Sequence, residues 1–562
     1  MKHDGVYYAG KSKEGDLLPE KRICSHLKVL ARTRDPQQSE WGVLLEWRDY
    51  DNHIHKWAMP LELLRGDSAD IVGELLRRGL DIPYGKKNKV VEYIQSSAPY
   101  KRITCTDKTG WHNHVYVTPE HVYGDEDSNF IYQSGAAGIQ SGFSTAGTLN
   151  GWRENVARYA QGNSRLVFSI SMAFAGSLVG LANIESGGVH FSGGSKDGKT
   201  TVLLAAASVF GHPDTYKRTY RATANALEGV ASLHNDGFLP LDELKQCTPK
   251  EAGEVVYMLA NGQDKARMKD HGGLRALKTW RLLFLSTGEI SLVDYLKSAG
   301  IQSYAGQEVR LANIPADAGK GYKILENLHG FQSVTDFFTH MHKAIRRHHG
   351  TAGAAWLETI TSEQETIREN LPDLISQFVA DVLPNNNSTQ ADTVAKRAAL
   401  VAIAGELATK HGLTGWQAGE ATAAAKRCFR DWLAEFGTGD REDLRILDTV
   451  RAFIERNGDK FMNHEEGREL SEGSELVRDL VGFHRLAGSE GREYLILASQ
   501  IERVVEGFNV KQAVKALLKH NWISKTETDS RGYTVASVRV TLPRFGRTRC
   551  YFLNLNAADT DV

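Results

Sequence analysis

The sequence predicts an α/β fold in which a parallel sheet carries a phosphate-binding loop. One observation is the stretch Gly187–Thr201, GGVHFSGGSKDGKTT, where a short apolar strand, a glycine-rich loop and an apolar helix follow one another. A second is the alternation of strand-like and helix-like segments over 216–287, the pattern of a parallel sheet covered by helices. The third is a change of character along the chain, which predicts a β-rich module, an α/β core, a helical lid and a winged-helix domain over 1–150, 151–329, 330–440 and 441–562.

The composition is that of an ordinary globular protein of several domains, because 562 residues are too many for one compact core. Lys and Arg total 68 against 69 Asp and Glu, so any nucleic-acid contact has to come from local patches. The five cysteines are scattered and include no C-x-x-C pair, which predicts a reducing cytoplasm rather than a disulfide framework or a zinc ribbon. We predict no signal peptide and no membrane span.

The glycine-rich stretch has the spacing of a P-loop, with Gly193 four residues before Gly198-Lys199-Thr200. Backbone N–H groups of such a loop cradle phosphates, the lysine neutralises them, and the hydroxyl binds Mg²⁺. The following helix points its N-terminus at the phosphates. A plain glycine-rich turn is the alternative. The predicted nucleotide-binding residues are Gly193, Gly194, Ser195, Lys196, Asp197, Gly198, Lys199, Thr200 and Thr201.

A second acidic element is expected at Gly237–Leu244, GFLPLDEL, which reads as an apolar strand ending in two acids. Asp242 would hold Mg²⁺ together with Thr200, and Glu243 would polarise the attacking water. Pro240 cannot donate to a sheet ladder, so the strand is either unpaired or bulged at that position. The alternative is an amphipathic helix with two solvated acids.

Two further side chains are candidates for catalysis. Trp280–Thr287 reads as the next buried strand, and the Thr287 hydroxyl would sense the γ-phosphate or orient water. A helix-cap role explains that hydroxyl nearly as well. Arg310 would complete the nucleotide site of a neighbouring subunit, with an ordinary surface ion pair as the alternative.

The segment Asn261–Lys278, NGQDKARMKDHGGLRALK, is basic, punctuated by glycines, and predicted to project from the core as a hairpin or loop. In a ring-shaped motor such a projection would contact the phosphates of a threaded strand. A solvated loop explains the same charges. The candidate DNA-binding residues are Lys265, Arg267, Lys269, Arg275 and Lys278.

The flanking parts are less informative. In the N-terminal module a helix is predicted at Ser68–Gly79, with Ser68 as its cap. Tyr100–Arg102 and Trp111-His112 interleave aromatic and cationic side chains, which permits a stacking surface for nucleic acid but favours a half-buried sheet face. In the helical part, Arg397 lies at the margin of an apolar helix face, where it either reaches the nucleotide or extends its stem along the core.

The C-terminal part reads as short helices followed by strands at Trp522–Lys525 and Val535–Thr541, the order of a winged helix. Such a domain would contact DNA or dock on another protein.

From the N-terminal module to Arg310 the sequence resembles the family catalogued as domain of unknown function 927. Its mobile-element P-loop ATPases resemble AAA+ replicative helicases of the minichromosome-maintenance type. The resemblance covers Gly110–His112, Gly193–Thr200, Arg221–Asn225, Leu241–Leu244, Asn261–Gln263 with Trp280-Arg281, and Val309-Arg310, and extends into the lid at Lys396–Ala399 and Ala404–Leu407.

The resemblance implies ATP as the nucleotide and a ring of subunits, with a hexamer as the expected size. Lys199, Thr200, Asp242 and Glu243 would act in one subunit, Arg310 would be the arginine finger of the next, Arg397 a second sensor, and 261–278 a DNA-facing hairpin. The chain departs from that class at Ser286-Thr287, where an asparagine is common.

The expected function is an ATP-driven DNA translocase or helicase in the replication of a plasmid, phage-like or integrated element. The expected partners are single-stranded or forked DNA, further copies of the chain, and a separate primase or replication protein. The alternative is an NTP-dependent protein remodeller or defence switch that does not act on DNA directly.

Overall fold

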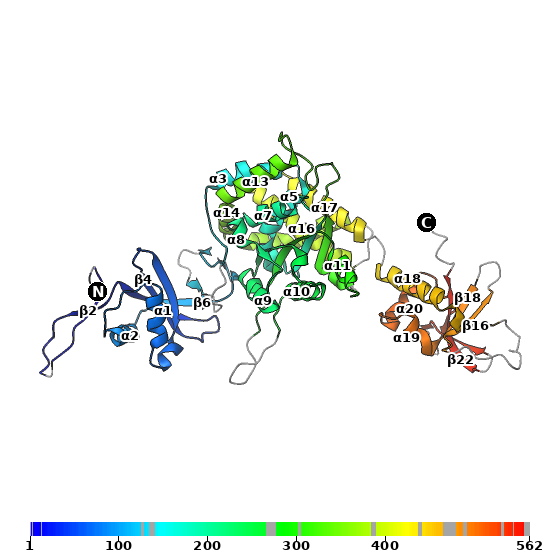
Figure 1. The fold of residues 1–562 in the computed structure, drawn as a ribbon, viewed down its shortest axis with the longest axis horizontal. Helices are drawn as coiled ribbons and strands as arrows, with labels where there is room; N and C mark the ends of the chain where they lie inside the picture. Colours follow the sequence, from blue (N-terminus) through cyan, green and yellow to red (C-terminus); the bar gives the residue numbers. More distant parts are fainter. Residues whose placement is uncertain are drawn as a thin grey trace. The chain divides into compact units, whose positions relative to one another are not determined.

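The computed structural model of the chain divides into two compact units, Met1–Glu435 and Phe436–Val562 (Figure 1). The break between the units lies close to the predicted boundary at 440, whereas the predicted boundaries near 150 and 330 lie inside the first unit. The structure describes residues 2–555 with the exception of 3, 13, 125–128, 134–140, 266–276, 302–304, 384–388, 437–440, 465–478, 487–491, 530–532 and 543–544.

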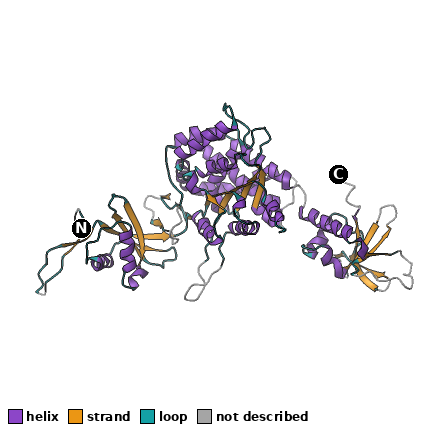
Figure 2. Ribbon diagram, in the orientation of Figure 1, coloured by secondary structure: helices purple, strands orange, loops and turns teal. Residues whose placement is uncertain are grey.

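The centre of the first unit is a five-stranded sheet with the order β12-β13-β14-β11-β15. All of its neighbouring strands are parallel, as predicted. Every residue of β13 and β14 is buried, as expected of a parallel sheet with helices on both faces (Figure 2). The strands are β11 (Gly187–Ser192), β12 (Arg218–Thr219), β13 (Gly237–Asp242), β14 (Leu282–Gly288) and β15 (Leu311–Pro315).

Pro240 lies inside β13 without a bulge, and the sheet explains why it is tolerated. Backbone groups two residues apart point to the same side of a strand, so the missing N–H of Pro240 faces the same side as the Phe238 carbonyl. That carbonyl accepts a hydrogen bond from the Tyr216 hydroxyl (3.0 Å). On this side β12 accompanies β13 only at Leu241 and Asp242. The backbone nitrogen of Pro240, which carries no hydrogen, therefore points to a side of β13 where no strand is paired at this residue.

Helices cover the sheet, and α5 (Ser164–Ala175) lies deepest, with all of its residues buried. It contacts α7 (Lys199–Ala207), which follows the glycine-rich loop, and α16 (Thr389–Lys410) (Figure 1). The helical stretch Ser164–Ala182 is long and apolar enough to cross a membrane, but 83% of its most apolar window is buried inside the protein. The sequence-based expectation that no run reaches that length is corrected by this stretch, which forms the core of the unit.

The predicted helical region is confirmed. It consists of helices joined by short connections, and α15 carries Pro372 in its interior. The first helix packs on α7, beside the glycine-rich loop. The helices are α13 (Val334–Arg347), α14 (Thr351–Ser362), α15 (Gln364–Val382), α16 and α17 (Glu420–Phe436).

The N-terminal module is built on a mixed sheet with the order β10-β6-β3-β4-β5. The predicted helix is present as α1 (Ala69–Arg77), but Ser68 has a φ of 61° and makes no capping hydrogen bond, so its predicted role as a cap is wrong. A second helix, α2 (Lys87–Ser96), escaped the sequence analysis. The strands are β3 (Leu27–Arg34), β4 (Gly42–Arg48), β5 (Ile54–Pro60), β6 (Arg102–Thr106) and β10 (Phe130–Tyr132).

A small antiparallel sheet of β7 (Gly110–His112), β8 (Val115–Val117) and β9 (Val122–Tyr123) contacts the α/β core. The Trp111 indole N–H donates to the Ser177 carbonyl (2.7 Å). Trp111 therefore serves packing, in agreement with the structural alternative for this residue.

The second unit contains a five-stranded sheet with the order β16-β17-β18-β22-β21, which is larger than a two-stranded wing. Its buried cluster combines residues of the sheet with residues of α18, α19 and α20. The helices are α18 (Arg441–Arg456), α19 (Ile501–Val504) and α20 (Val510–Lys519), and the main strands are β16 (Phe461–Asn463), β17 (Gly482–Leu486), β18 (Arg492–Leu497), β21 (Val538–Leu542) and β22 (Gly546–Asn554).

The strand predicted at Trp522–Lys525 is present only as a single antiparallel bridge between Ile523 and Leu553 of β22. The Ser524 N–H donates to the Phe552 carbonyl and the Asn554 N–H to the Trp522 carbonyl (both 2.9 Å). The Trp522 N–H bonds back to the Leu517 carbonyl (2.9 Å), so this segment closes the end of α20. Its indole is buried, which produced the apolar signal. The predicted strand Val535–Thr541 is interrupted, because one short strand ends at Val535 and β21 begins at Val538. A winged helix stays a prediction.

Candidate nucleotide-binding site

The glycine-rich loop joins the carboxyl end of β11 to the start of α7, as the P-loop spacing predicts. Gly198 has a φ of 93°, and a Cβ on it would lie 2.1 Å from the ring of Phe338 on α13. Only glycine fits both conditions. One turn further along α13, His342 Nε2 lies 3.0 Å from the Thr201 hydroxyl. Helix α13 therefore contacts both the last loop residue and the first turn of α7.

Lys199 is the first residue of α7, and its side chain folds over the loop. The Nζ atom donates to the carbonyls of Gly193 (2.9 Å) and Gly194 (2.6 Å), and the residue is buried. Its ammonium group thus lies within the glycine-rich loop, where the P-loop mechanism needs a positive charge for bound phosphates.

The carboxylate of Asp242 forms the polar centre of the site. Its Oδ1 accepts hydrogen bonds from the hydroxyls of Thr200 (3.2 Å) and Thr287 (2.7 Å). Its Oδ2 forms an ion pair with Lys217 Nζ (3.1 Å). Because β13 and β14 are neighbours in register, their carboxyl ends bring Asp242 and Thr287 together. A carboxylate beside a hydroxyl is a donor set that suits Mg²⁺.

Lys217 was missed by the sequence analysis. It directly precedes β12, which pairs with β13 over two residues only. A strand this short has no readable periodicity, so its register against Asp242 has no signal in the sequence.

Glu243 adopts a left-handed backbone conformation, with φ 60° and ψ 85°. This conformation costs roughly 1–2 kcal/mol for a residue with a Cβ. The Glu243 N–H donates to the Thr287 hydroxyl (3.2 Å), which holds the turn. Within the described part of the chain its carboxylate makes no hydrogen bond or ion pair. The Thr287 hydroxyl therefore positions both acidic residues. It donates to the side-chain carboxylate of Asp242 and accepts from the backbone N–H of Glu243.

Ser286 serves the core rather than the site, although it neighbours Thr287. Its hydroxyl lies 2.8 Å from His190 Nδ1 and 2.9 Å from the Tyr220 hydroxyl. His190 Nε2 lies 3.0 Å from the Ile290 carbonyl and therefore carries the proton. Burial lowers the pKa of His190 to about 4, so the ring is neutral at pH 7.

A loop that follows β15 also reaches the glycine-rich loop. The Ala316 N–H donates to the Ser192 carbonyl (2.8 Å), and Lys323 Nζ donates to the Lys196 carbonyl (2.8 Å). The sequence analysis did not find Lys323, because 127 residues separate it from its partner.

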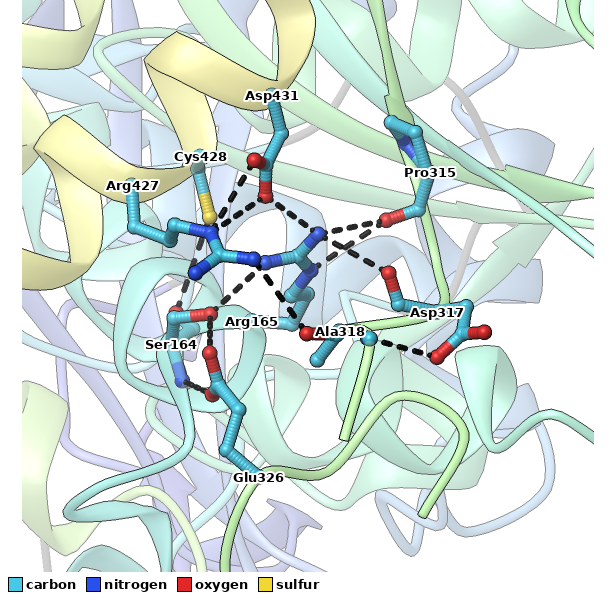
Figure 3. A network of polar contacts seen from close by, with 10 residues as sticks. Ser164, Arg165, Pro315, Asp317, Ala318, Glu326, Arg427, Cys428 and Asp431 are labelled. Carbon is cyan, nitrogen blue, oxygen red and sulfur yellow. Dashed lines mark hydrogen bonds and ion pairs between the residues drawn. The ribbon is translucent and has the colours of Figure 1, made fainter. Parts of the chain in front are cut away.

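The buried guanidinium of Arg165 on α5 holds this loop (Figure 3). It forms an ion pair with Asp431 of α17 (2.7 Å) and donates to the carbonyls of Pro315 and Asp317. Asp431 also binds Arg427 (3.0 Å). The network therefore joins the end of β15 to α5 and α17, and it rigidifies the wall beside the glycine-rich loop.

Arg397 lies at the opposite end of β11. It donates to the Val309 carbonyl, and a Cβ on Gly187 would lie 1.9 Å from its guanidinium. Burial lowers the pKa of Arg397 to about 10. Gly187 is the first residue of β11 and the glycine-rich loop follows its last, a separation of about 20 Å at about 3.3 Å per residue. Arg397 therefore cannot contact a nucleotide on its own chain, which corrects the predicted contact.

Arg310 ends α12 (Ala305–Arg310), directly before β15. Its guanidinium stacks over the Tyr257 ring (4.8 Å) and donates to the Gly306 carbonyl (2.9 Å). No described carboxylate forms an ion pair with it, so the surface ion pair considered as an alternative is not found. Arg310 and Arg397 line one cavity of about 530 Å³.

The predicted basic projection has an antiparallel base. Gln263 pairs with Thr279, and Asp264 donates its N–H to the Lys278 carbonyl (3.0 Å). This pairing directs the chain away from α10 (Pro249–Asn261) and back into β14. Lys265 and Lys278 flank the base, whereas three of the candidate DNA-binding residues lie outside the described residues: Arg267, Lys269 and Arg275.

Among the described residues, no group of three or more His, Cys, Asp or Glu side chains is arranged to hold a metal ion. A metal at this site would therefore be held by the hydroxyl of Thr200 and the carboxylate of Asp242 together with the nucleotide itself, the usual situation for Mg²⁺.

The parallel sheet, the glycine-rich loop and the acidic strand end define an α/β protein with a candidate phosphate-binding loop at the carboxyl edge of its sheet. Residues 1–279, just under half of the chain, match the family described as a domain of unknown function, DUF927.

The chain shares its fold with a solved structure titled SCCmec type IV Cch, active helicase. The TM-score is 0.67 at 18% identity, over 96% of this chain and 95% of that one. The C-terminal region of NrS-1 matches with a TM-score of 0.23 at 11% identity, over 72% of this chain and 91% of that one. NtrX from Brucella abortus in complex with ADP matches with a TM-score of 0.17 at 13% identity, over 46% of this chain and 49% of that one. These two scores are too low to carry an argument. No curated protein matches the chain.

Proposed function

We propose that the protein is an ATP-driven DNA translocase or helicase that works as a ring in the replication of a plasmid, phage-like or integrated element. The observation that carries the proposal is the meeting of Thr200, Asp242 and Thr287 in one hydrogen-bonded cluster beside the loop that holds Lys199. The shared fold with a structure titled active helicase, over nearly the full length of both chains, supports the same function.

In this mechanism the loop N–H groups and Lys199 bind the phosphates of ATP. Mg²⁺, when bound, neutralises the charge that develops on the transferred phosphoryl group. Thr200 and Asp242 would hold the ion. Glu243 orients the attacking water and accepts its proton. Thr287 holds the Asp242 carboxylate and the Glu243 backbone N–H.

The positions of the two arginines support the proposed ring. Arg310 and Arg397 line one cavity, and Arg397 is separated from its own glycine-rich loop by the length of β11. We propose that both charges serve the nucleotide of an adjacent copy, Arg310 as an arginine finger and Arg397 as a second sensor. A hexamer is the proposed size of this ring.

The other parts have separate tasks. The basic projection, Asn261–Lys278, contacts the phosphates of single-stranded or forked DNA. Residues 330–440 form a lid on the core of 151–329, and 441–562 contact DNA or a replication partner such as a separate primase. The five cysteines are free thiols, which supports a reducing cytoplasm.

The test is steady-state ATP hydrolysis by the full chain, with and without single-stranded DNA, alongside Lys199→Ala. We expect hydrolysis that DNA stimulates several-fold and that the variant loses. Hydrolysis that depends on Lys199 but is indifferent to DNA would favour the alternative, a protein remodeller or defence switch. Hydrolysis that survives in Lys199→Ala would contradict the nucleotide site itself.

A further inference from the structure

A group of basic and aromatic side chains lies in the N-terminal module where β3 ends and β6 begins. We call this group the β3–β6 patch. It is far along the chain from the nucleotide site and from the basic projection. Its members are Arg32, Arg34, Trp41, Tyr100, Lys101 and Arg102.

Strand register places like charges next to one another in this patch. Arg32 of β3 pairs directly with Arg102 of β6 in a parallel ladder. Directly paired residues share a sheet face, and like charges in that position destabilise a sheet. Two residues beyond Arg32, Arg34 stacks its guanidinium over the ring of Trp41 (5.8 Å). The pairing concentrates positive charge beside an aromatic ring.

The patch is open to solvent. Tyr100 is 99% exposed, and Trp41 is 40% exposed. A half-buried sheet face, the structural alternative for Tyr100, is therefore excluded. Lys101 and Arg102 are also exposed. No described carboxylate forms an ion pair with any of the four cations, so their charge is not neutralised within the described part of the chain.

Local structure explains only part of this arrangement. Arg32 donates to the Ser97 carbonyl (3.3 Å) at the end of α2, a favourable position for a cation. Arg102 donates to the carbonyls of Pro99 and Tyr100. Neither contact requires a fully exposed tyrosine or the exposed ammonium of Lys101.

We propose that the β3–β6 patch binds single-stranded DNA, with bases stacked on Tyr100 and Trp41 and phosphates held by the four cations. Exposed rings offer a π-face to any base, and cations beside them follow the backbone, which is how sequence-independent binding of single strands works. An acidic protein segment would use the cations but would gain little from the rings. The inference rests on the proposed function and adds a DNA contact outside the α/β core.

The test is binding of the full chain, without nucleotide, to a fluorescent 30-nucleotide oligothymidine, followed by anisotropy. The variant is Tyr100→Ala with Lys101→Gln and Arg102→Gln. We expect its affinity to fall by about 10-fold or more, because stacking alone is worth roughly 5- to 150-fold per base. The salt dependence of log K should also become shallower by roughly 1.4, the share of two phosphate contacts.

The matched control removes one exposed aromatic ring and two lysines from the same sheet region, Tyr50→Ala with Lys28→Gln and Lys56→Gln. Tyr50 is 76% exposed, and both lysines are paired with Glu46. The control is expected to bind as the wild type does. Tyr100→Phe should also bind normally, because it keeps the ring.

The outcomes separate the two proposals. Equal affinity of the patch variant and the wild type would overturn the patch while leaving the proposed function intact. An equal loss of DNA affinity in the control variant would also overturn the proposed binding by the β3–β6 patch. The loss would then reflect the removal of positive charge anywhere on the module. A wild type that binds no DNA would overturn both. Hydrolysis without DNA should be unchanged in the patch variant, which shows that it is folded.

Discussion

Lys217 Nζ lies 3.1 Å from Asp242 Oδ2, so the carboxylate proposed to hold Mg²⁺ already carries a cation of its own chain. The two side chains are 23% and 12% exposed, which makes this a partly buried pair. The other carboxylate oxygen of Asp242, Oδ1, accepts hydrogen bonds from the hydroxyls of Thr200 and Thr287. Mg²⁺ would add a second positive charge to this carboxylate, so Lys217 and the metal compete for it.

Removal of Lys217 should therefore reduce the requirement for metal. We expect Lys217→Gln to lower the Mg²⁺ concentration for half-maximal ATP hydrolysis, because the variant removes a positive charge that competes with the metal for the Asp242 carboxylate. The measurement is a Mg²⁺ titration at saturating ATP. Lys245→Gln is the control, because Lys245 is paired with Glu289 at the exposed surface. An unchanged half-saturation point in Lys217→Gln would refute the competition.

Thr287→Val should impair hydrolysis more than nucleotide binding. The substitution keeps the shape of the side chain but removes the donor to Asp242 and leaves the Glu243 N–H without its acceptor. Loss of a buried hydrogen-bond partner costs about 1–3 kcal/mol. We expect kcat to fall roughly 5- to 150-fold, with a Kd for ATP within a factor of a few. A larger change in Kd than in kcat would contradict the positioning role of Thr287.

His190 makes stability depend on pH in the acid range. Its pKa is lowered by burial to about 4, below the ordinary value near 6.5, so the unfolded chain takes up a proton that the folded chain excludes. Stability is therefore lost as pH falls from about 6.5 to 4, by up to about 1.4 kcal/mol per pH unit. We expect the gap in Tm between the wild type and His190→Gln to narrow over that range.

A gap in Tm between the wild type and His190→Gln that stays constant from pH 6.5 to pH 4 would show that His190 does not titrate in this way.

Arg310 should act on a neighbouring copy. Arg310→Ala and Lys199→Ala are each expected to lose hydrolysis, by about 10³-fold or more for the arginine finger. In an equal mixture, random assembly gives roughly a quarter of the sites an intact Lys199 in one subunit and an intact Arg310 in the next. Hydrolysis should therefore return to about that fraction of the wild-type rate. A mixture as inactive as its components would place Arg310 outside the neighbour's site.

The sequence was informative where the signal is local. The strand, loop and helix around Lys199 follow one another without interruption, so their order was readable from spacing alone. Asp242 and Thr287 were also found, because the carboxyl ends of parallel strands meet at one edge of a sheet. The strand predicted at Trp522–Lys525 is reduced to one bridge at Ile523, since a buried ring at a helix end and a ring in a strand give the same apolar signal.

The residues that the sequence analysis missed or misplaced depend on distant pairing. Lys217 depends on the register of a two-residue strand, and Lys323 on a loop far along the chain. Arg397 lies on the predicted helix, but helical periodicity identifies a face and not which end of the sheet that face reaches. Its position at Gly187 became visible only with the tertiary packing.

The buried pair of Arg165 and Asp431 also has a mechanical consequence. Asp431 belongs to the last turns of α17, which ends at Phe436, where the second unit begins. A force applied to the second unit would be transmitted to the core through α17. The Arg165–Asp431 ion pair, which joins α17 to α5, would resist that force (Figure 3). The Arg165 guanidinium also donates to the carbonyls of Pro315 and Asp317 in the loop beside the glycine-rich loop. A force on α17 and a movement at the nucleotide site would therefore both act on Arg165.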